Sequence, residues 1–196
     1  MLKGELFNQE MVQAYLEERK LHTCRPVKPQ EMVFIDGHAE PFTAAEISAE
    51  ESTEIAYIFT CRNFRRCIFP KFQPGDFMYA RETWGIPIGL TEKKIIYKAD
   101  FTDAGAPLAD GEHWRPSIHM PREAARLFFR VTEVDVMRME DVTEEFARED
   151  GFQNDPHCTA KAKFIGFWLD TYGPDAYWMW VYWTAPCTRE EALKNE

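Results

Sequence analysis

The aromatic stretch near the C-terminus, Tyr177 to Thr184, constrains the fold of this chain more than any other feature. Successive side chains of a β-strand point to opposite faces, and here both faces are apolar. One face carries Tyr177, Met179, Val181 and Trp183, and the other carries Trp178, Trp180 and Tyr182. Such a strand needs cover on both sides, so we expect an α+β fold, a small β-barrel with flanking helices. The alternative is that some of these rings are exposed and stack on bases.

The chain has 196 residues and 45% hydrophobic residues, enough for the core of one large domain. Apolar spacing, caps and turn signals predict the elements. We expect helices over residues 9–19, 141–150 and 159–172, and strands over 77–84, 94–98, 126–137 and 177–184. Residues 36–69 have only short apolar runs among acidic and turn-forming residues. We therefore expect a single domain over 1–196 with an irregular insertion at 36–69.

A short polar stretch, Glu18 to Arg25, follows the first expected helix and is closed by Pro26. A lysine acts as a base only if burial or a nearby cation lowers its pKa, and Arg19 and Arg25 are candidate cations for Lys20. Thr23 is then the hydroxyl that Lys20 activates. The alternative is a basic turn at the C-terminus of a helix, where the helix dipole favours cations.

A second unusual position is Asp150, which we expect to end a helix that begins with the capping-box pattern Asp141-Val-Thr-Glu144. Gly151 follows in the position where helices commonly end. A carboxylate at a helix C-terminus faces the negative end of the dipole and is unfavourable unless a cation offsets it. Asp150 is therefore a candidate functional residue, and a tolerated surface aspartate is the alternative.

Two further segments contain candidate binding residues. The segment Trp114-Arg115-Pro116-Ser117-Ile118-His119-Met120-Pro121-Arg122 has prolines on either side of a serine and a histidine. Prolines stiffen the backbone, which suits a loop held in one shape beside a ligand, and His119 is a candidate proton carrier. The strand after Pro74-Gly75-Asp76 contains Arg81-Glu82-Thr83-Trp84, in which successive side chains face different neighbours.

These motifs, in this order along the chain, resemble the ASCH domain superfamily, and most closely the ASCH-domain proteins of phages and prophages. The resemblance covers roughly residues 5–35 and 70–184. It implies a PUA-like β-barrel with helices packed around it, a fold shared with RNA-binding domains. The family signature is Gly-x-Lys-x-x-Glu-x-Arg. Lys20 and Arg25 match it, Thr23 stands at the Glu position, and Glu18 replaces the Gly.

Small bacterial members with Thr at that position are amidohydrolases of N4-acylated cytidines that use a Lys, a Thr and a Glu. The resemblance implies these roles for Lys20 and Thr23. The family Glu aligns best with Asp150, whose side chain is shorter by one methylene. The family argument and the dipole argument thus select Asp150 independently.

Two functions follow as hypotheses. In the first, the chain is a hydrolase of N4-acylcytidine that needs no metal and no cofactor. Lys20 takes the Thr23 proton, Thr23 attacks the amide carbon, and Asp150 relays the proton to the leaving amine. The second is a non-catalytic module that binds a nucleoside, a nucleotide or a short RNA or DNA. The expected substrate-binding residues are Arg25, Arg81, Glu82, Trp84, Trp114, Arg115, Ser117 and His119, with Arg122 as a further phosphate contact in the module.

Charge and cysteine usage restrict the partners. The formal charge of −10 opposes non-specific binding to nucleic acid, so any such contact is local. No apolar run is long enough for a membrane span or a signal peptide, so we expect no membrane association and a cytoplasmic protein. Five cysteines without a C-x-x-C pair indicate free thiols in a reducing compartment. A metal site of Cys61, Cys67, His157 and Cys158 is the alternative.

Overall fold

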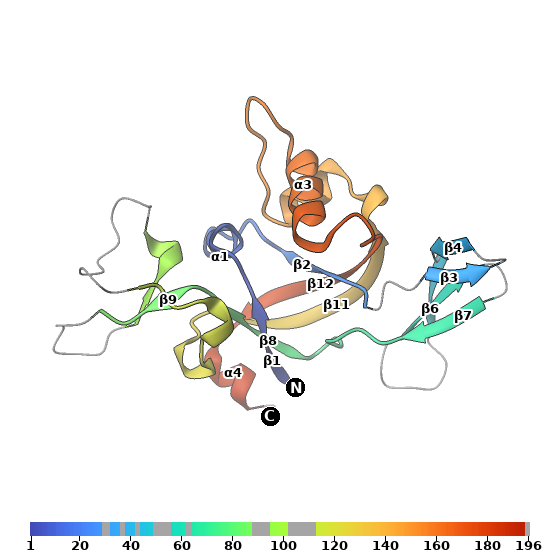
Figure 1. Cartoon of the computed structure of the whole chain (residues 1–196). Coiled ribbons are helices and arrows are strands. Elements are labelled where there is room, and N and C mark those ends of the chain that lie inside the picture. The colour runs from blue at the N-terminus through green and yellow to red at the C-terminus, as the bar shows by residue number, and fades with distance from the viewer. Residues whose placement is uncertain are drawn as a thin grey trace. The chain divides into compact units, whose positions relative to one another are not determined.

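The structure is a computed structural model that describes residues 1–28, 32–35, 38–41, 44–48, 56–61, 64–87, 95–101 and 113–194 (Figure 1). Only the backbone is described within residues 32–66. The described part has the expected α+β class, with a five-stranded sheet in the order β1-β8-β11-β12-β2. These strands are β1 (Leu2–Leu6), β8 (Phe77–Arg81), β11 (Phe128–Arg138), β12 (Trp178–Cys187) and β2 (His22–Pro26). The α-helices are α1 (Gln9–Leu16), α2 (Glu144–Glu149), α3 (Ala160–Tyr172) and α4 (Arg189–Leu193). Closure of the strands into a barrel stays a prediction.

The chain divides into two compact units. Unit 1 comprises Met1–Leu21, Asp76–Arg130 and Ala185–Glu196, and unit 2 comprises His22–Gly75 and Val131–Thr184. The expectation of a single domain with an insertion stays a prediction.

In unit 1, β1 runs parallel to β8, with Leu2 opposite Phe77 and Leu6 opposite Arg81. The first residues of β11 pair antiparallel with β8, with Phe128 opposite Tyr79. The single strand expected over 77–84 is two strands in the structure: β8 ends at Arg81, and Trp84–Gly85 forms β9. Strand β9 pairs antiparallel with β10 (Ile96–Tyr97). The core of unit 1 consists of Phe77, Trp84, Met120, Ala124, Ala125, Phe128 and Ala192.

Helix α1 begins as expected at Asn8, whose side chain accepts a hydrogen bond from the Met11 amide at 2.8 Å. It ends at Leu16, earlier than the expected residue 19, because Glu18 adopts a left-handed backbone conformation with φ 58°. This conformation is costly for a non-glycine residue and does not continue a helix. Lys20 therefore lies beyond the helix, and its amide donates to the Ala14 carbonyl at 3.1 Å.

Unit 2 is built on the antiparallel pair β2 and β12, with Val181 opposite Cys24 and Tyr182 opposite Thr23. Helices α2 and α3 cover one face of this pair (Figure 1). That core contains Cys24, Val142, Phe146, Ala147, Ala160, Phe164, Trp168, Ala176, Met179 and Val181. On the other face, the Tyr182 ring lies 5.3 Å from the Phe72 ring. Both faces of β12 are thus buried over residues 178–182, as its sequence predicts.

The end of α2 places Asp150. Thr143, not Asp141, caps the start of α2, by accepting a hydrogen bond from the Phe146 amide at 3.1 Å. At the other end, the Gly151 amide donates to the Arg148 carbonyl and the Phe152 amide donates to the Ala147 carbonyl. With Gly151 at φ 100°, these bonds form a Schellman motif. Asp150 is consequently fixed as the C-cap residue of α2.

The expected insertion contains strands, so the prediction that it is irregular was wrong. Strands β3 (Met32–Ile35) and β4 (His38–Pro41) form one antiparallel pair. Strands β5 (Ala44–Ser48), β6 (Ala56–Cys61) and β7 (Phe64–Ile68) form a separate three-stranded sheet. The short apolar runs near residues 32–35 and 55–60 coincide with β3 and β6. Although this segment has few apolar residues, pairing of its strands satisfies the hydrogen-bonding groups of its backbone.

Short 3-10 turns complete the described chain, at Lys98–Asp100, Ser117–His119, Arg122–Ala124 and Met139–Asp141. Among the described residues, no helix combines the length and the apolar character needed to cross a membrane.

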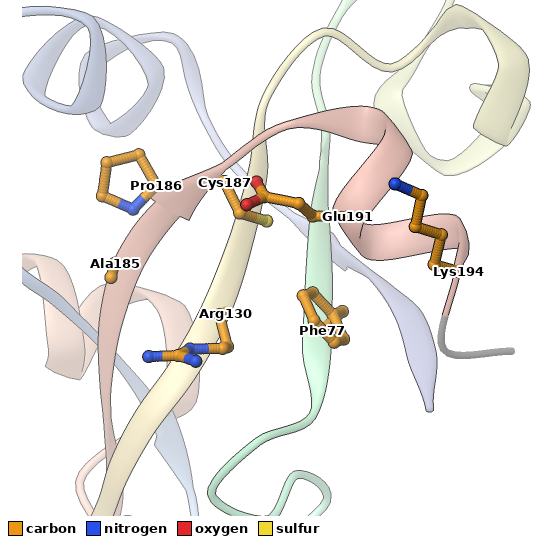
Figure 2. A pocket seen from close by; sticks show the side chains of 7 residues that line it. All are labelled: Phe77, Arg130, Ala185, Pro186, Cys187, Glu191 and Lys194. Atoms are coloured by element: carbon orange, nitrogen blue, oxygen red, sulfur yellow. The ribbon is translucent and has the colours of Figure 1, made fainter.

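Unit 1 has an open cavity of about 440 Å³ beside α4 (Figure 2). Its lining consists of Phe77, Arg130, Ala185, Pro186, Cys187, Glu191 and Lys194. Burial, followed by the nearby Glu191 carboxylate, raises the pKa of the Cys187 thiol, so this cysteine is not an activated nucleophile. None of the residues expected to bind substrate lines this cavity.

Candidate functional site

Strand β2 carries four polar or reactive side chains in succession and sorts them onto two faces. His22 and Cys24 share one face, and Thr23 and Arg25 share the other, because side chains alternate along a strand. The register places His22 opposite Trp183 and Cys24 opposite Val181, on the face that α2 and α3 cover. Thr23 lies opposite Tyr182, and Arg25 lies opposite Trp180.

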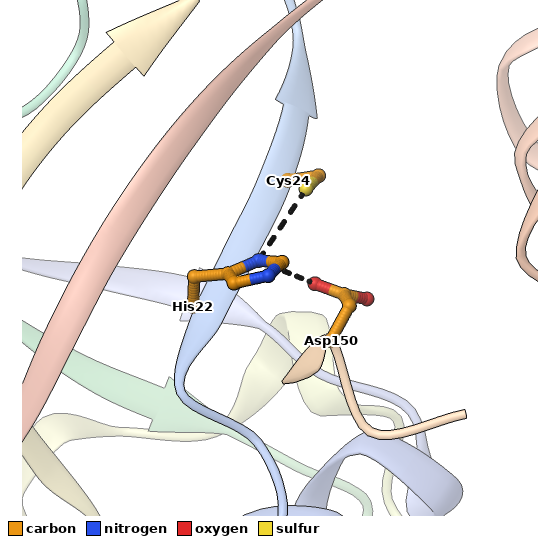
Figure 3. Close-up of side chains that lie close together, drawn as sticks. All are labelled: His22, Cys24 and Asp150. Atoms are coloured by element: carbon orange, nitrogen blue, oxygen red, sulfur yellow. Dashed lines mark hydrogen bonds and ion pairs between the residues drawn. The ribbon is translucent and has the colours of Figure 1, made fainter. Parts of the chain in front are cut away.

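On the covered face, His22 lies between Cys24 and Asp150 (Figure 3). His22 Nδ1 is 3.2 Å from Asp150 Oδ1 and 3.8 Å from Cys24 Sγ. The imidazole stacks on Phe146 with 4.2 Å between ring centroids, and it makes an edge-to-face contact with Trp183 with 4.6 Å between centroids. His22 has no solvent exposure, and Cys24 and Asp150 are also buried. Burial of a carboxylate is costly unless polar partners compensate it, and the imidazole is one such partner.

On the opposite face, the Arg25 guanidinium Nη1 donates to Thr23 Oγ1 at 3.0 Å and to the Cys24 carbonyl at 2.7 Å. A cationic donor on a hydroxyl oxygen stabilises negative charge that develops there, and so favours nucleophilic attack by that oxygen. The structure thus brings together Thr23 and Arg25, two of the residues that the sequence selects.

Lys20, the expected base, belongs to unit 1 and is buried. Its ammonium group lies 5.7 Å from the centroid of the Tyr15 ring, within range of a cation–π interaction. The Tyr15 ring in turn packs on Phe129 at 4.2 Å. Thr23 and Asp150 belong to unit 2, but Asp150 lies beside His22 and Cys24, on the opposite face of β2 from Thr23. The assembly of the three residues into one catalytic site stays a prediction.

Glu82, an expected binding residue, is already held by another side chain. It is 2% exposed, and Arg126 binds both of its oxygens, at 2.9 Å and 3.0 Å. Arg126 also donates to Asp100 at 2.6 Å, and its guanidinium lies over the Tyr97 ring at 4.0 Å. Burial raises the pKa of Glu82 above its usual value, although Arg126 opposes that rise. This arrangement is an ion pair of unit 1 in which Glu82 is buried and Arg126 is partly exposed.

The remaining expected binding residues lie around one loop of unit 1. Arg81 donates to the Ile118 carbonyl, and the Arg115 guanidinium lies 4.9 Å from the Trp84 ring. Trp84 is buried, so its ring is not available for stacking on a base in this conformation. Trp114 and Ser117 are half-buried, whereas Arg115 and His119 are exposed. The binding roles of these residues stay predictions.

Sequence reasoning missed two tertiary partners, His22 and Arg126. His22 and Cys24 lie in the selected stretch, and their alternation just before Pro26 was a signal for a strand that places both on one face. Nothing in the sequence pairs Arg126 with Glu82, because the contact joins residues 44 positions apart. The sequence also offers a metal site of Cys61, Cys67, His157 and Cys158 as an alternative. In the structure, His157 and Cys67 are exposed, and the Cys61 side chain lies outside the described residues.

The group of His22, Cys24 and Asp150 has the residue types of a thiol protease triad but a different geometry. A relay needs the nucleophile and the carboxylate on different nitrogens of the imidazole. Here both approach Nδ1, and Nε2 has no hydrogen-bond partner in the part of the chain that the structure describes. The arrangement therefore does not support nucleophilic attack by Cys24.

Comparison with known proteins adds no assignment. No protein-family model, no curated protein and no solved structure matches this chain.

Proposed function

We propose that this chain is an ASCH-type, PUA-like protein of the cytoplasm that acts on nucleosides. Its substrate class is N4-acylated cytidine, which it hydrolyses to cytidine and a carboxylic acid. The proposal rests on the order of motifs in the sequence and on the burial of the residues that those motifs select.

The observation that carries the proposal is burial. Lys20, Thr23 and Asp150 are 3%, 0% and 3% exposed. The other buried polar residues in the described part are Glu5, His22 and Glu82. Lysine and aspartate are almost never fully buried unless they are paired, because removing a charge from water is costly. Three residues selected for their chemistry thus belong to the small buried polar set.

In the proposed reaction, the Lys20 amine removes the Thr23 proton and Thr23 Oγ1 attacks the amide carbon. Arg25, which donates to that oxygen at 3.0 Å, stabilises the developing negative charge. The tetrahedral intermediate collapses when the protonated Lys20 amine returns its proton to the exocyclic amine of cytosine, which then leaves. Asp150 lies on the opposite face of β2 from Thr23 and takes no part in this step. Water then hydrolyses the acyl-threonine and restores the hydroxyl. Lys20 enters this scheme from the sequence spacing alone.

The test is acetate release from N4-acetylcytidine by the full-length protein. We expect Lys20→Met and Thr23→Ala each to lower the rate about a hundredfold or more. Asp150→Asn should lower it less, because Asp150 lies on the opposite face of β2 from Thr23. Thr23→Ser keeps a hydroxyl and should retain part of the activity. Lys28→Met and Thr132→Ala are matched controls, because both residues are exposed. Release by Thr23→Ala at the wild-type rate would exclude the mechanism.

A second candidate, binding without turnover, is favoured by the loop that contains Trp114 and His119. The Arg81 bond to the Ile118 carbonyl holds this loop, and Arg115 and His119 are exposed on it. A fixed loop with an exposed guanidinium and an exposed imidazole suits a phosphate or a nucleotide. Salt-sensitive binding of cytidine nucleotides that weakens in Arg115→Ala, without acetate release, supports the module and contradicts the hydrolase.

A further inference from the structure

Three buried side chains of unit 2, His22, Cys24 and Asp150, present their ligand atoms to one another (Figure 3). The imidazole nitrogen, the thiol sulfur and the carboxylate oxygen all lie within 4.8 Å of one another. Alternate positions on β2 supply the nitrogen and the sulfur, and the C-cap of α2 supplies the oxygen. Nitrogen, sulfur and oxygen atoms of these residue types are the ligands that Zn²⁺ takes from proteins.

The distances are close to those around a tetrahedral zinc ion. Zn–N and Zn–O bonds are about 2.0–2.2 Å and Zn–S bonds are about 2.3 Å, so neighbouring ligand atoms lie roughly 3.3–3.6 Å apart. In this protein the nitrogen is 3.2 Å from the oxygen and 3.8 Å from the sulfur. Both separations are within a few tenths of an ångström of these values, and the sulfur lies within 4.8 Å of the carboxylate oxygen, so metal binding would draw these two atoms together.

A network of protons alone explains the arrangement less well. Both neighbours approach the same ring nitrogen, Nδ1, which carries at most one proton. If that proton is present it serves one neighbour, and if it is absent the nitrogen turns its lone pair toward a carboxylate. A cation between the three atoms is attracted to all of them at once.

We propose that His22, Cys24 and Asp150 bind a divalent transition-metal ion of the Zn²⁺ class. The ligand atoms are His22 Nδ1, Cys24 Sγ and a carboxylate oxygen of Asp150. Three protein ligands leave the fourth tetrahedral position open for water or another small ligand. This proposal goes beyond the proposed hydrolase, and metal binding is measured without turnover, so each proposal can fail alone.

The test uses Co²⁺, because cobalt replaces zinc at such sites and its bond to a thiolate gives a charge-transfer absorption band. The full-length protein carries no histidine tag and is first stripped with a chelator. We expect a single Co²⁺ ion per chain, a thiolate band at saturation, and loss of the band when Zn²⁺ displaces Co²⁺. Absence of the band at stoichiometric Co²⁺ overturns the proposal.

Two variants assign the band to Cys24. In a variant with Cys61, Cys67, Cys158 and Cys187 all replaced by serine, Cys24 is the remaining thiol of the chain, and the band should persist. Cys24→Ser in the wild-type background should abolish the band and weaken Co²⁺ binding about tenfold or more. Survival of the band in Cys24→Ser contradicts the assignment. If Cys24→Ser does not fold, the first variant decides, because a folded Cys24-only protein without the band also overturns the proposal.

Discussion

The Glu82 carboxylate and the Arg126 guanidinium form a two-bond contact inside unit 1, with Glu82 almost fully buried. A buried pair of this kind adds little net stability, because desolvation of both charges opposes their attraction. Loss of one partner is a different matter, since the remaining charge is then buried alone. Glu82 and Arg126 are therefore a structural pair whose integrity matters for folding.

Arg126→Met should lower the free energy of unfolding by about 3 kcal/mol near neutral pH, because it leaves the Glu82 carboxylate without its partner. Burial raises the folded-state pKa of Glu82 above the usual 4.5, and removal of Arg126 raises it further. A raised carboxyl pKa means that the folded state binds more protons, so stability falls as the pH rises through the folded pKa. The difference between variant and wild type should consequently shrink as the pH falls toward 4.5.

Urea unfolding at several pH values measures this difference. Arg130→Met is the control, because Arg130 is exposed on β11 and such surface changes stay within about 0.5 kcal/mol. A penalty for Arg126→Met that is the same at acid and neutral pH would show that lost packing, not the Glu82 charge, is responsible.

At the scale of the element, helix α3 begins on three capping groups, one of which is the Asn154 side chain, whose oxygen accepts from the Ala160 amide at 2.6 Å. The Thr159 hydroxyl accepts from the Ala162 amide at 3.2 Å, and the Glu144 carboxylate accepts from the Ala160 and Lys161 amides. Glu144 lies in the first turn of α2, so one carboxylate fastens the start of α3 to α2. A carboxylate is well placed there, because a helix N-terminus carries unsatisfied amides and the positive end of the dipole.

Glu144→Gln should destabilise the protein at neutral pH and have no effect in acid. Although partial desolvation opposes the shift, hydrogen bonds from the Lys161 amide, the Thr159 side chain and the Ala160 amide lower the pKa of Glu144. A lowered carboxyl pKa gives stability that is present above the usual 4.5 and is lost as the pH falls through the folded pKa. Thermal unfolding across that range measures the effect. Glu145→Gln, a neighbour in the same turn of α2, is the matched control.

Local chemistry explains which elements the sequence predicts well. Asn8, Thr159, Gly151 and Gly173 mark helix ends through their own side chain or backbone, so α1, α3 and the end of α2 are predictable from short stretches. The early end of α1 could not be predicted, because glutamate does not ordinarily adopt the left-handed backbone conformation that Glu18 has here.

The residues of the candidate site also differ in how far the sequence predicts them. Asp150 is found from its clash with the helix dipole, whereas His22 beside it depends on a contact across 128 positions that no local pattern contains.

At the scale of the whole molecule, the segment that follows β2 starts near Val27 and ends near Lys71, and both of these residues bond to strand β12. The Val27 amide donates to the Trp178 carbonyl at 3.0 Å, and the Lys71 amide donates to the Tyr182 hydroxyl at 3.1 Å. Trp178 and Tyr182 are both on β12, about 13 Å apart along a strand. A short link can therefore join the two ends of the segment.

Replacement of residues 29–66 by a glycine-serine linker of about eight residues should leave a folded protein, because such a linker spans about 15 Å on average. Far-UV circular dichroism and a cooperative thermal transition measure folding, and Co²⁺ binding reports on His22, Cys24 and Asp150. A linker in place of residues 160–172, which removes α3 and its core contacts, is the contrasting control and should not fold. Loss of the cooperative transition in the first variant would mean that the segment is part of the folding unit rather than an insertion.

The register of β2 against β12 has a consequence for how this chain can change. Because Cys24 sits opposite Val181, a slip of a single residue would turn the imidazole and the thiol away from Asp150 and bring the hydroxyl and the guanidinium to it. One inserted or deleted residue next to β2 would thus exchange two kinds of chemistry between the two sides of the sheet. A change within β2 itself therefore keeps this arrangement only when residues are added or removed in steps of two.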